Sequence, residues 1–334
     1  MNLHSAQEVG ADIAAVAALL QIGAEIGVDQ VLDSGRTFGV PELAEVTGLP
    51  QEGLQEYVHA LSAAGLLVAE GGEGGEGGEG LYRASDDYPD WRHQAGYLSW
   101  ALTANSPFLQ NARAFLSDGE SAADTYHRDG RRVAVSSRWI GDRAFYPAVV
   151  ERVVAADAKH VVDLGAGAAG LLIGLLAQDD RRSGVALDLS AGACAAAREA
   201  AGRAGVDDRL RVVERSVESL IADPGPLEGA DVIQACFVMH DVLQDEAVFD
   251  DVLRTCRKAL APGGLLAVVD AVSYGQEDRE RKFSALFTYL HANFMGVALP
   301  TEDQWVEKFR SAGFSHVDCV SGLMPGGRLF LATK

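Results

Sequence analysis

The sequence predicts an α/β protein in which a doubly wound, mostly parallel sheet follows a smaller α-helical domain. Three observations predict this fold. Strand and helix patterns alternate from residue 160 onward, a glycine-rich turn follows the first of these strands, and the first 90 residues show helical apolar spacing. With 334 residues, 48% of them hydrophobic and 23% charged, the chain can bury one large or two ordinary cores.

The N-terminal part, residues 1–90, has the order of a winged helix-turn-helix. An alanine-rich packing helix over Ala6–Gly27 comes first. A short helix over Pro41–Val46, a turn, and a second helix over Gln51–Ala64 then precede an apolar strand. The wing is the hairpin Leu66–Arg83, whose tip is the solvated repeat EGGEGGEGGEG over residues 70–80.

Charge argues against nucleic acid as a partner of this winged helix. The chain has 28 Lys and Arg against 48 Asp and Glu, a formal net charge of −20, which repels phosphate backbones. The second helix of the motif offers Gln51, Glu52, Gln55, Glu56 and His59 and no Lys or Arg to reach base edges. We therefore expect the domain to serve homodimerisation and no nucleic-acid or membrane partner.

The N-terminus and the cysteines predict a cytoplasmic protein. The first 25 residues carry no Lys or Arg ahead of their apolar stretch, unlike a secretory signal, and no apolar run is expected to reach the length of a membrane span. The four cysteines (Cys194, Cys236, Cys256 and Cys319) are widely spaced within apolar segments, which predicts reduced core residues.

A helical connector and substrate lid is expected over residues 91–150, with helices at Trp91–Ala101, Pro107–Leu116 and Arg131–Val150. The catalytic domain is expected over residues 151–334. Its predicted strands are 160–165, 184–189, 209–214, 231–237 and 264–271, followed by a terminal hairpin of 316–322 and 327–334. Its predicted helices are 169–178, 191–204, 246–260, 281–294 and 302–312.

The turn after the first strand of this domain predicts an adenosine cofactor. Gly165, Gly167 and Gly170 let the backbone approach a ligand, and Asp188 ends the second strand, where a carboxylate can accept hydrogen bonds from ribose. This fingerprint alone also permits a nicotinamide dehydrogenase. Asp163, however, puts a carboxylate where a pyrophosphate would be repelled and an ammonium group held.

These residues, with Ala261-Pro262-Gly263-Gly264 before the fifth strand and the terminal hairpin, resemble the class I S-adenosylmethionine (SAM) methyltransferases over residues 150–334. The resemblance implies a Rossmann-like, seven-stranded sheet with a C-terminal antiparallel hairpin. The cofactor residues it implies are Asp163, Gly165, Gly167, Asp188, Leu189, Ser216, Cys236 and Phe237. One departure is Arg215-Ser216 after the third strand, where many relatives carry an Asp for the adenine amine.

His240 and Asp241 follow the fourth strand, at the sheet edge where open α/β folds bind ligands. A similar His-Asp pair supplies a histidine general base in the dimeric small-molecule O-methyltransferases with an N-terminal winged helix. Imidazole suits that task because its ordinary pKa lies near working pH.

The chain also resembles, over its full length, the metal-dependent C-methyltransferases that methylate the β-carbon of 2-oxo acids such as phenylpyruvate in antibiotic biosynthesis. The segments that carry this resemblance are 126–129, 138–147, 236–241 and 294–301. It implies a divalent metal or iron at His240, Asp241 and His291, and Arg128 as a catalytic residue that pairs with the substrate carboxylate. The substrate residues it implies are Trp100, Ser106, Arg128 and Tyr146.

The sequence thus predicts a homodimeric SAM-dependent methyltransferase, with metal-assisted C-methylation of a 2-oxo acid as the main hypothesis. The alternative is a metal-free O-methyltransferase in which His240 deprotonates a phenol. A regulatory protein that keeps the SAM fold without catalysis is a more distant alternative. Asp270, which ends the fifth strand, is predicted either to orient His240 or to cap the following loop.

Overall fold

The computed structural model describes residues 3–70 and 80–334, with side chains from residue 9 onward in the first helix. These residues divide into two compact units, residues 1–112 with 126–143 and residues 113–125 with 144–334. The predicted division into dimerisation domain, lid and catalytic domain by function stays a prediction.

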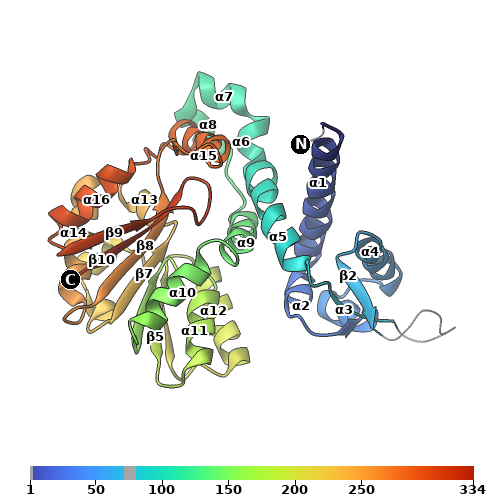
Figure 1. Ribbon diagram of the computed structural model, residues 1–334, viewed down its shortest axis with the longest axis horizontal. Coiled ribbons are helices and arrows are strands. Elements are labelled where there is room, and N and C mark those ends of the chain that lie inside the picture. The colour runs from blue at the N-terminus through green and yellow to red at the C-terminus, as the bar shows by residue number, and fades with distance from the viewer. Residues whose placement is uncertain (1–2, 71–79) are drawn as a thin grey trace. The chain divides into compact units, whose positions relative to one another are not determined.

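The first unit contains the winged helix-turn-helix arrangement (Figure 1). Its helices are α1 (Leu3–Ile26), α2 (Asp29–Asp33), α3 (Val40–Thr47), α4 (Gln51–Ala63), α5 (Tyr88–Leu98), the π-helix η1 (Ser99–Ala104), α6 (Ser106–Gln110) and α9 (Gly130–Gly141). Its strands β1 (Phe38–Gly39), β2 (Leu67–Glu70) and β3 (Leu81–Ala84) pair antiparallel in the order β1-β3-β2. Most of the predicted wing tip, residues 71–79, lies outside the described residues.

Helix α1 corrects one expectation from the sequence. Over Val9–Ile26 it is long and apolar enough to cross a membrane on length and composition alone, so the prediction that no apolar run reaches that length was wrong. Its residues Val16, Leu20 and Ala24 are buried in the hydrophobic core of the first unit. The helix therefore supplies one wall of that core, a role that gives a helix the same apolar composition.

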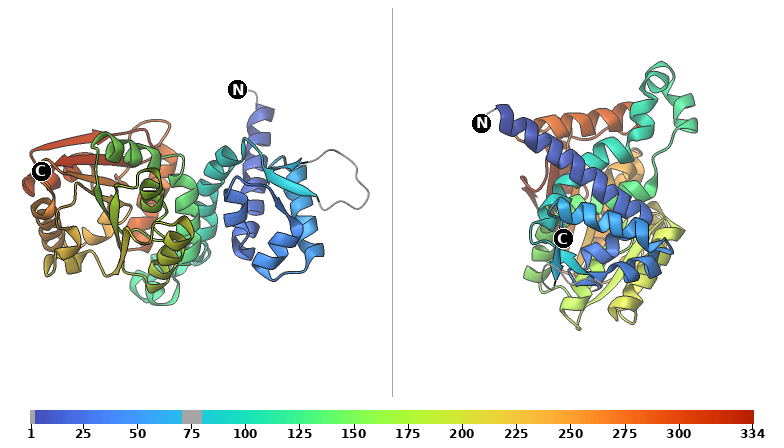
Figure 2. Two further views of the ribbon diagram at one scale, coloured as in Figure 1. Left: turned by 90° about the horizontal axis from the view of Figure 1, so that it is seen from below. Right: turned by 90° about the vertical axis from the view of Figure 1, so that its right-hand side faces the viewer.

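The second unit is a seven-stranded sheet with helices on both faces. Its strands are β4 (His160–Leu164), β5 (Ser183–Asp188), β6 (Leu210–Glu214), β7 (Val232–Cys236), β8 (Leu265–Ala271), β9 (His316–Val320) and β10 (Gly327–Thr333). They lie in the order β6-β5-β4-β7-β8-β10-β9, and only β10, which is drawn in red with β9 at one edge in Figure 2, runs antiparallel to both of its neighbours, β8 and β9. The predicted Rossmann-like fold with a terminal hairpin is confirmed.

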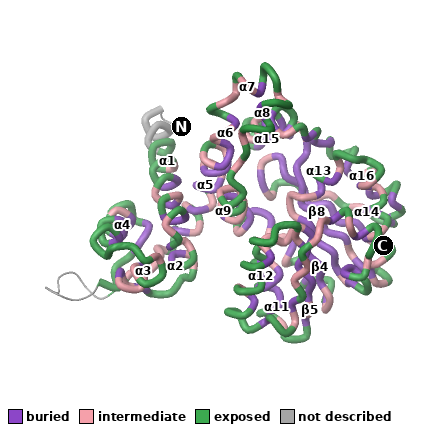
Figure 3. The backbone as a smooth tube through the Cα atoms, turned by 180° about the vertical axis from the view of Figure 1, so that it is seen from behind, coloured by how far each residue is buried: buried purple, intermediate pink, exposed green. Residues whose placement is uncertain are grey.

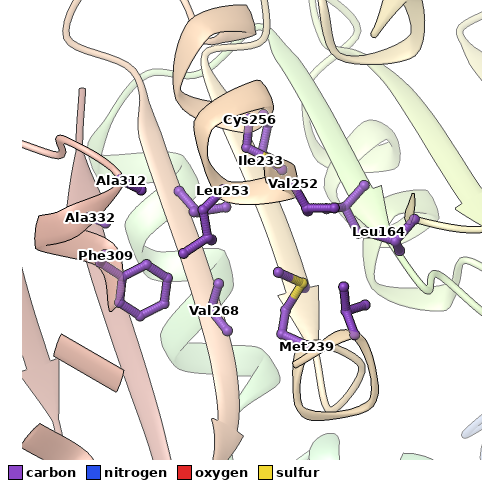
Figure 4. Packing of buried hydrophobic residues seen from close by; sticks show 14 of the residues in the cluster. Leu164, Ile233, Met239, Val252, Leu253, Cys256, Val268, Phe309, Ala312 and Ala332 are labelled. Carbon is purple, nitrogen blue, oxygen red and sulfur yellow. The ribbon is translucent and has the colours of Figure 1, made fainter. Parts of the chain in front are cut away.

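The helices of this unit follow the strands they connect. They are α7 (Ala112–Ser117), α8 (Gly119–Thr125), α10 (Tyr146–Ala155), α11 (Gly170–Gln178), α12 (Ala191–Ala204), the 3₁₀ helices η2 (Glu218–Ile221) and η3 (Gly225–Leu227), α13 (Met239–Val242), α14 (Glu246–Ala259), α15 (Arg281–Phe294) and α16 (Glu302–Ser311). Figure 3 shows the central strands buried and the helices α11, α12, α14 and α16 with exposed outer faces. The residues of α14 and α16 that face inward pack on one side of the sheet, as Figure 4 shows for Val252, Leu253 and Phe309.

Two of the predicted helices are each divided in two. The helix predicted over 107–116 is divided into α6, which ends at Gln110, and α7, which begins at Ala112. The segment predicted as a single helix over 131–150 is broken between α9, which ends at Gly141, and α10, which begins at Tyr146. Pro147 stands in the first turn of α10, where its missing N–H costs nothing, whereas inside a continuous helix it would remove a hydrogen bond.

A buried ion pair fixes the segment between β8 and α15. Glu280, which precedes α15, accepts two hydrogen bonds from the Arg328 guanidinium of β10 at 2.9 and 3.0 Å and a third from the Gly326 N–H at 3.1 Å. Glu280 is 3% and Arg328 6% exposed. Hydrogen bonds from Arg328 hold the pKa of Glu280 down at about 2.

We expect Glu280→Gln to destabilise the protein by about 3 kcal/mol, because it leaves the buried Arg328 guanidinium with only the partly exposed Glu302 carboxylate as an ionic partner. Glu277→Gln, which removes a carboxylate from an exposed ion pair with Arg279, should change stability by less than about 1 kcal/mol. Since the folded pKa is depressed, the stabilisation is complete above the unfolded value of about 4.3 and is lost as pH falls toward 2. Urea denaturation between pH 2.5 and 7 checks both statements, and equal effects of the two substitutions would contradict them.

Candidate functional site

A cavity of about 150 Å³ lies at the carboxyl ends of β4, β5, β6 and β7. This is the edge at which open α/β sheets bind ligands. The cavity is lined by residues that end or follow these four strands: Gly165, Leu187, Asp188, Leu189, Arg215, Ser216, Val217, Cys236, Phe237 and Val238. The predicted cofactor residues Gly165, Asp188, Leu189, Ser216, Cys236 and Phe237 are thus brought together, whereas Asp163 and Gly167 lie outside this lining.

The glycine-rich turn is built around backbone conformations that side chains disfavour. Gly165 has φ +68°, and a Cβ on it would lie 3.0 Å from the Val238 side chain. Ala169, the N-cap residue just before α11, also has a positive φ, 57°. A glycine at 165 therefore lets the turn lie close to Val238 in the segment after β7.

Asp188 organises this turn. Its Oδ2 accepts a hydrogen bond from the Gly167 N–H at 2.8 Å, and its Oδ1 accepts one from the Ser190 N–H at 2.9 Å. The carboxylate thereby joins the end of β5 to the glycine turn after β4. The sequence predicted that Asp188 binds ribose. It did not predict that Asp188 also accepts hydrogen bonds from the glycine turn, because no local sequence pattern indicates such contacts.

Asp163 lies beneath the turn and is 6% exposed. Burial raises the pKa of its carboxyl to about 7, with the charge on Asp188 adding to the rise and the neighbouring Gln234 amide opposing it. A cationic ligand group would favour the ionised form and reverse part of this rise. A buried carboxylate below a turn made only of glycine and alanine, next to the cavity, fits a cofactor that carries an ammonium group.

His240 lies in the short helix α13, directly after the cavity residues Phe237 and Val238. Its Nδ1 lies 2.6 Å from Asp270 Oδ1, and its backbone N–H donates to Asp270 Oδ2 at 3.0 Å. Since an ionised carboxylate only accepts, Nδ1 carries the hydrogen and Nε2 the lone pair. Asp270 is fully buried at the end of β8, and it orients His240, one of the two roles that the sequence left open.

Buried apolar packing anchors the turn that carries His240. Met239, the preceding residue, is fully buried and packs with Leu164 of β4 and Val252 of α14 in the hydrophobic core (Figure 4). Gln244 adds a hydrogen bond from Nε2 to the His240 carbonyl at 2.6 Å. The imidazole is therefore held on a rigid support.

Aromatic rings connect the cavity to His240. Phe237, whose φ is +55°, lies 5.1 Å between ring centroids from Phe145 and 6.1 Å from Phe287. Phe287 stacks on His291 at 4.1 Å, and the His291 ring meets the His240 ring edge-on at 5.1 Å. A wall of this kind suits a planar, aromatic ligand.

The structure does not support the predicted metal site. Within residues 3–70 and 80–334 no group of three or more His, Cys, Asp and Glu is placed to hold a metal ion. Asp241 has a side chain 65% exposed, and its carboxylate lies 3.6 Å from His240 Nε2. The His291 Nδ1 bonds to the Phe287 carbonyl at 2.8 Å, and its ring packs against Phe287.

The remaining predicted substrate residues belong to two units. Trp100, in η1, is 4% exposed, Ser106 begins α6 and donates to the Thr103 carbonyl, and Arg128 lies 5.9 Å over the Phe108 ring, all in the first unit. Tyr146, at the start of α10 in the second unit, packs edge-on against Phe145 at 4.8 Å. Their roles toward a substrate stay predictions.

We expect Asp270→Asn to lower kcat by about 100-fold, since the amide no longer selects the tautomer with the lone pair on Nε2. Cofactor affinity should change less than about threefold, because Asp270 does not line the cavity. Steady-state kinetics and calorimetry on one preparation check this prediction, and an unchanged kcat would contradict the orienting role.

Comparison with known proteins agrees with this geometry. Residues 162–266 match the family model described as a methyltransferase domain. Over 317 residues the chain is 25% identical to a 3-hydroxy-5-methyl-1-naphthoate 3-O-methyltransferase of Streptomyces sahachiroi, covering 90% of this chain and 87% of that protein. It is 32% identical to aclacinomycin 10-hydroxylase RdmB of Streptomyces purpurascens over 157 residues, which is 47% of this chain and 40% of that relative's length.

The fold has a solved counterpart over its whole length. The pyocyanin biosynthetic protein PhzM superimposes with a TM-score of 0.56 at 19% identity and covers 100% of both chains. At this identity the likeness shows the fold alone.

Proposed function

The chain is a class I SAM-dependent methyltransferase, and from this premise we propose that it methylates a hydroxyl oxygen of an aromatic small molecule. The observation that carries the proposal is the His240–Asp270 pair, held at 2.6 Å immediately after the residues that line the cavity. Relatives named O-methyltransferases support oxygen as the acceptor atom better than the predicted carbon of a 2-oxo acid.

Cofactor binding is assigned to the residues at the carboxyl ends of the strands. Asp163 pairs with the ammonium group, Asp188 and Ser216 face the ribose and base, and Gly165 lets the ligand approach the turn. SAM supplies an electrophilic methyl group. Leu189, 73% exposed at the rim, offers apolar surface to the base.

His240 acts as the general base. Asp270 keeps the hydrogen on Nδ1 and stabilises the imidazolium that forms once Nε2 has taken the hydroxyl proton. The resulting phenolate is the better nucleophile for methyl transfer. The aromatic wall from Phe237 to His291 supports a planar acceptor and helps to exclude water.

The experiment is methyl transfer from radiolabelled SAM to a hydroxynaphthoate, with phenylpyruvate as the comparison acceptor. The proposal expects label on the naphthoate oxygen, no loss of rate after chelator treatment, and less than one metal ion in ten chains by elemental analysis. Transfer to the phenylpyruvate carbon that a chelator abolishes would contradict it. So would SAM binding without transfer to any hydroxylated aromatic.

Arg128 is proposed to pair with a carboxylate on the acceptor, and Trp100 and Ser106 to contact it. We expect Arg128→Ala to raise KM about tenfold for a hydroxynaphthoate and to leave KM for a naphthol without a carboxylate within about twofold. Equal changes in KM for the two acceptors would show that Arg128 does not bind the carboxylate.

We propose a homodimer that forms through the first unit and resides in the cytoplasm. In this unit Val9, Ile22, Leu102 and Leu109 are apolar side chains with 39–59% exposure. Burying such side chains against a second copy would remove apolar surface from water. Light scattering should give twice the mass of the 334-residue chain, and a monomer across micromolar concentrations would contradict the proposal.

A further inference from the structure

Gln234 is a fully buried glutamine in the central strand β7 that the function above does not use. Its exposure is 0%, and neither its Nε2 nor its Oε1 has a hydrogen-bond partner. Buried side-chain amides are nearly always hydrogen-bonded, since leaving both atoms unpaired is unfavourable. An amide without hydrogen bonds in the middle of a sheet therefore indicates that its hydrogen bonds form when a ligand binds.

The sheet register places one polar side chain beside it. In the parallel pair of β4 and β7, Gln234 lies opposite Asp163, and residues opposite each other point to the same face. The outer neighbours in this row are Ala186 beside Asp163 and Ala267 beside Gln234. Asp163 and Gln234 are therefore two adjacent polar groups between two alanines, and each is the other's only polar neighbour in the row.

This pair lies directly beneath the cofactor cavity. Two residues farther along the chain are Gly165, just beyond the end of β4, and Cys236, the last residue of β7, and both line the cavity. Gly165 has no side chain to separate the pair from the cavity above it. A ligand group that enters over Gly165 thus meets the Asp163 carboxylate first and the amide beside it.

We infer that Gln234 is a positioning residue of the cofactor site, whose amide holds Asp163 ionised and oriented for the ammonium group of SAM. In the cofactor-bound state Nε2 donates to the Asp163 carboxylate, and Oε1 offers the ammonium group a second acceptor beside it. An ammonium group has three N–H donors, so a carboxylate with an amide oxygen next to it matches it better than a carboxylate alone. The inference rests on the cofactor and is independent of which acceptor atom is methylated.

The variant to test is Gln234→Met, which keeps length and burial and removes the hydrogen-bonding atoms. Calorimetry measures binding of two ligands between pH 6 and 8.5: S-adenosylhomocysteine, which has the ammonium group, and 5′-methylthioadenosine, which lacks the amino-acid part. We expect affinity for S-adenosylhomocysteine to fall about tenfold at neutral pH and its pH midpoint to rise by about one unit, because Asp163 loses a donor to its charged form. Affinity for 5′-methylthioadenosine should stay within about twofold.

If Gln234 only supports the fold, the outcome of these measurements is different. If Gln234→Met weakens both ligands equally, or binds S-adenosylhomocysteine as the parent does at every pH, the inference is overturned. Gln234→Glu is the second variant in case methionine prevents folding. It puts a carboxyl next to Asp163, so the pair keeps a proton to higher pH and the midpoint should again rise, with 5′-methylthioadenosine unaffected. An unchanged midpoint in that variant would overturn the inference as well.

Discussion

His240→Ala is expected to lower kcat for methyl transfer about 1,000-fold, because it removes the only imidazole that Asp270 orients beside the cavity in the described residues. SAM affinity should change less than about threefold, since His240 is not among the lining residues. Single-turnover transfer to a hydroxynaphthoate and calorimetry with SAM separate these two quantities.

The matched control is His316→Ala on the edge strand β9, where the imidazole lies on the surface and pairs with Asp318. This variant should keep full activity. If His240→Ala turns over at the parental rate, the general-base assignment is wrong. If the His240→Ala variant no longer binds SAM, His240 belongs to the cofactor site, and this result also contradicts the general-base assignment.

Asp163→Asn is expected to weaken SAM binding about 30-fold at pH 7.5, because the amide lacks the charge that pairs with the ammonium group. In the parent protein, affinity should rise with pH through about 7, where Asp163 ionises. Below that value each pH unit should reduce affinity by up to about tenfold. In the Asn variant the pH dependence between 5.5 and 7.5 should vanish.

The same carboxyl makes the stability of the ligand-free protein depend on pH. Its folded pKa is raised, so the stabilisation is complete below the unfolded value of about 3.9 and is lost as pH rises through about 7. Thermal unfolding with and without SAM checks this: the shift that SAM produces should grow from pH 6 to pH 7.5. If the increase in unfolding temperature with SAM becomes smaller from pH 6 to pH 7.5, the pairing of Asp163 with the ammonium group is contradicted.

The sequence predicted the second unit well because local and tertiary preferences agree there. Val161, Val162 and Leu164 make a strand that is apolar on both faces, which is what a central parallel strand needs. The carboxyl ends of parallel strands share one edge, so Gly165, Asp188 and Cys236 could be grouped before any coordinates were known.

Other features depend on contacts that no local pattern encodes. The π-helix Ser99–Ala104 has ordinary helix-forming residues, and helix α8 was not predicted at all. The tautomer of His240 is set by Asp270, 30 residues later in the chain.

The structure does not support the metal prediction, for a related reason. A resemblance can match residue types, but it does not fix where they point. His291 is brought near His240, yet its ring stacks on Phe287 four residues earlier on α15, and Asp241 is mostly exposed. Whether three donors converge depends on such rotamers, and rotamers follow from packing.

Phe237 has a backbone conformation that glycine adopts more easily than any aromatic residue. An engineer who screens this protein for heat tolerance would find glycine at 237 attractive, since relief of such strain is worth roughly 1 kcal/mol or more. That substitution would delete the ring between Phe145 and Phe287 and with it one side of the acceptor wall. Thermostability and turnover are thus in conflict at one residue, and selection for the first alone would erode the second.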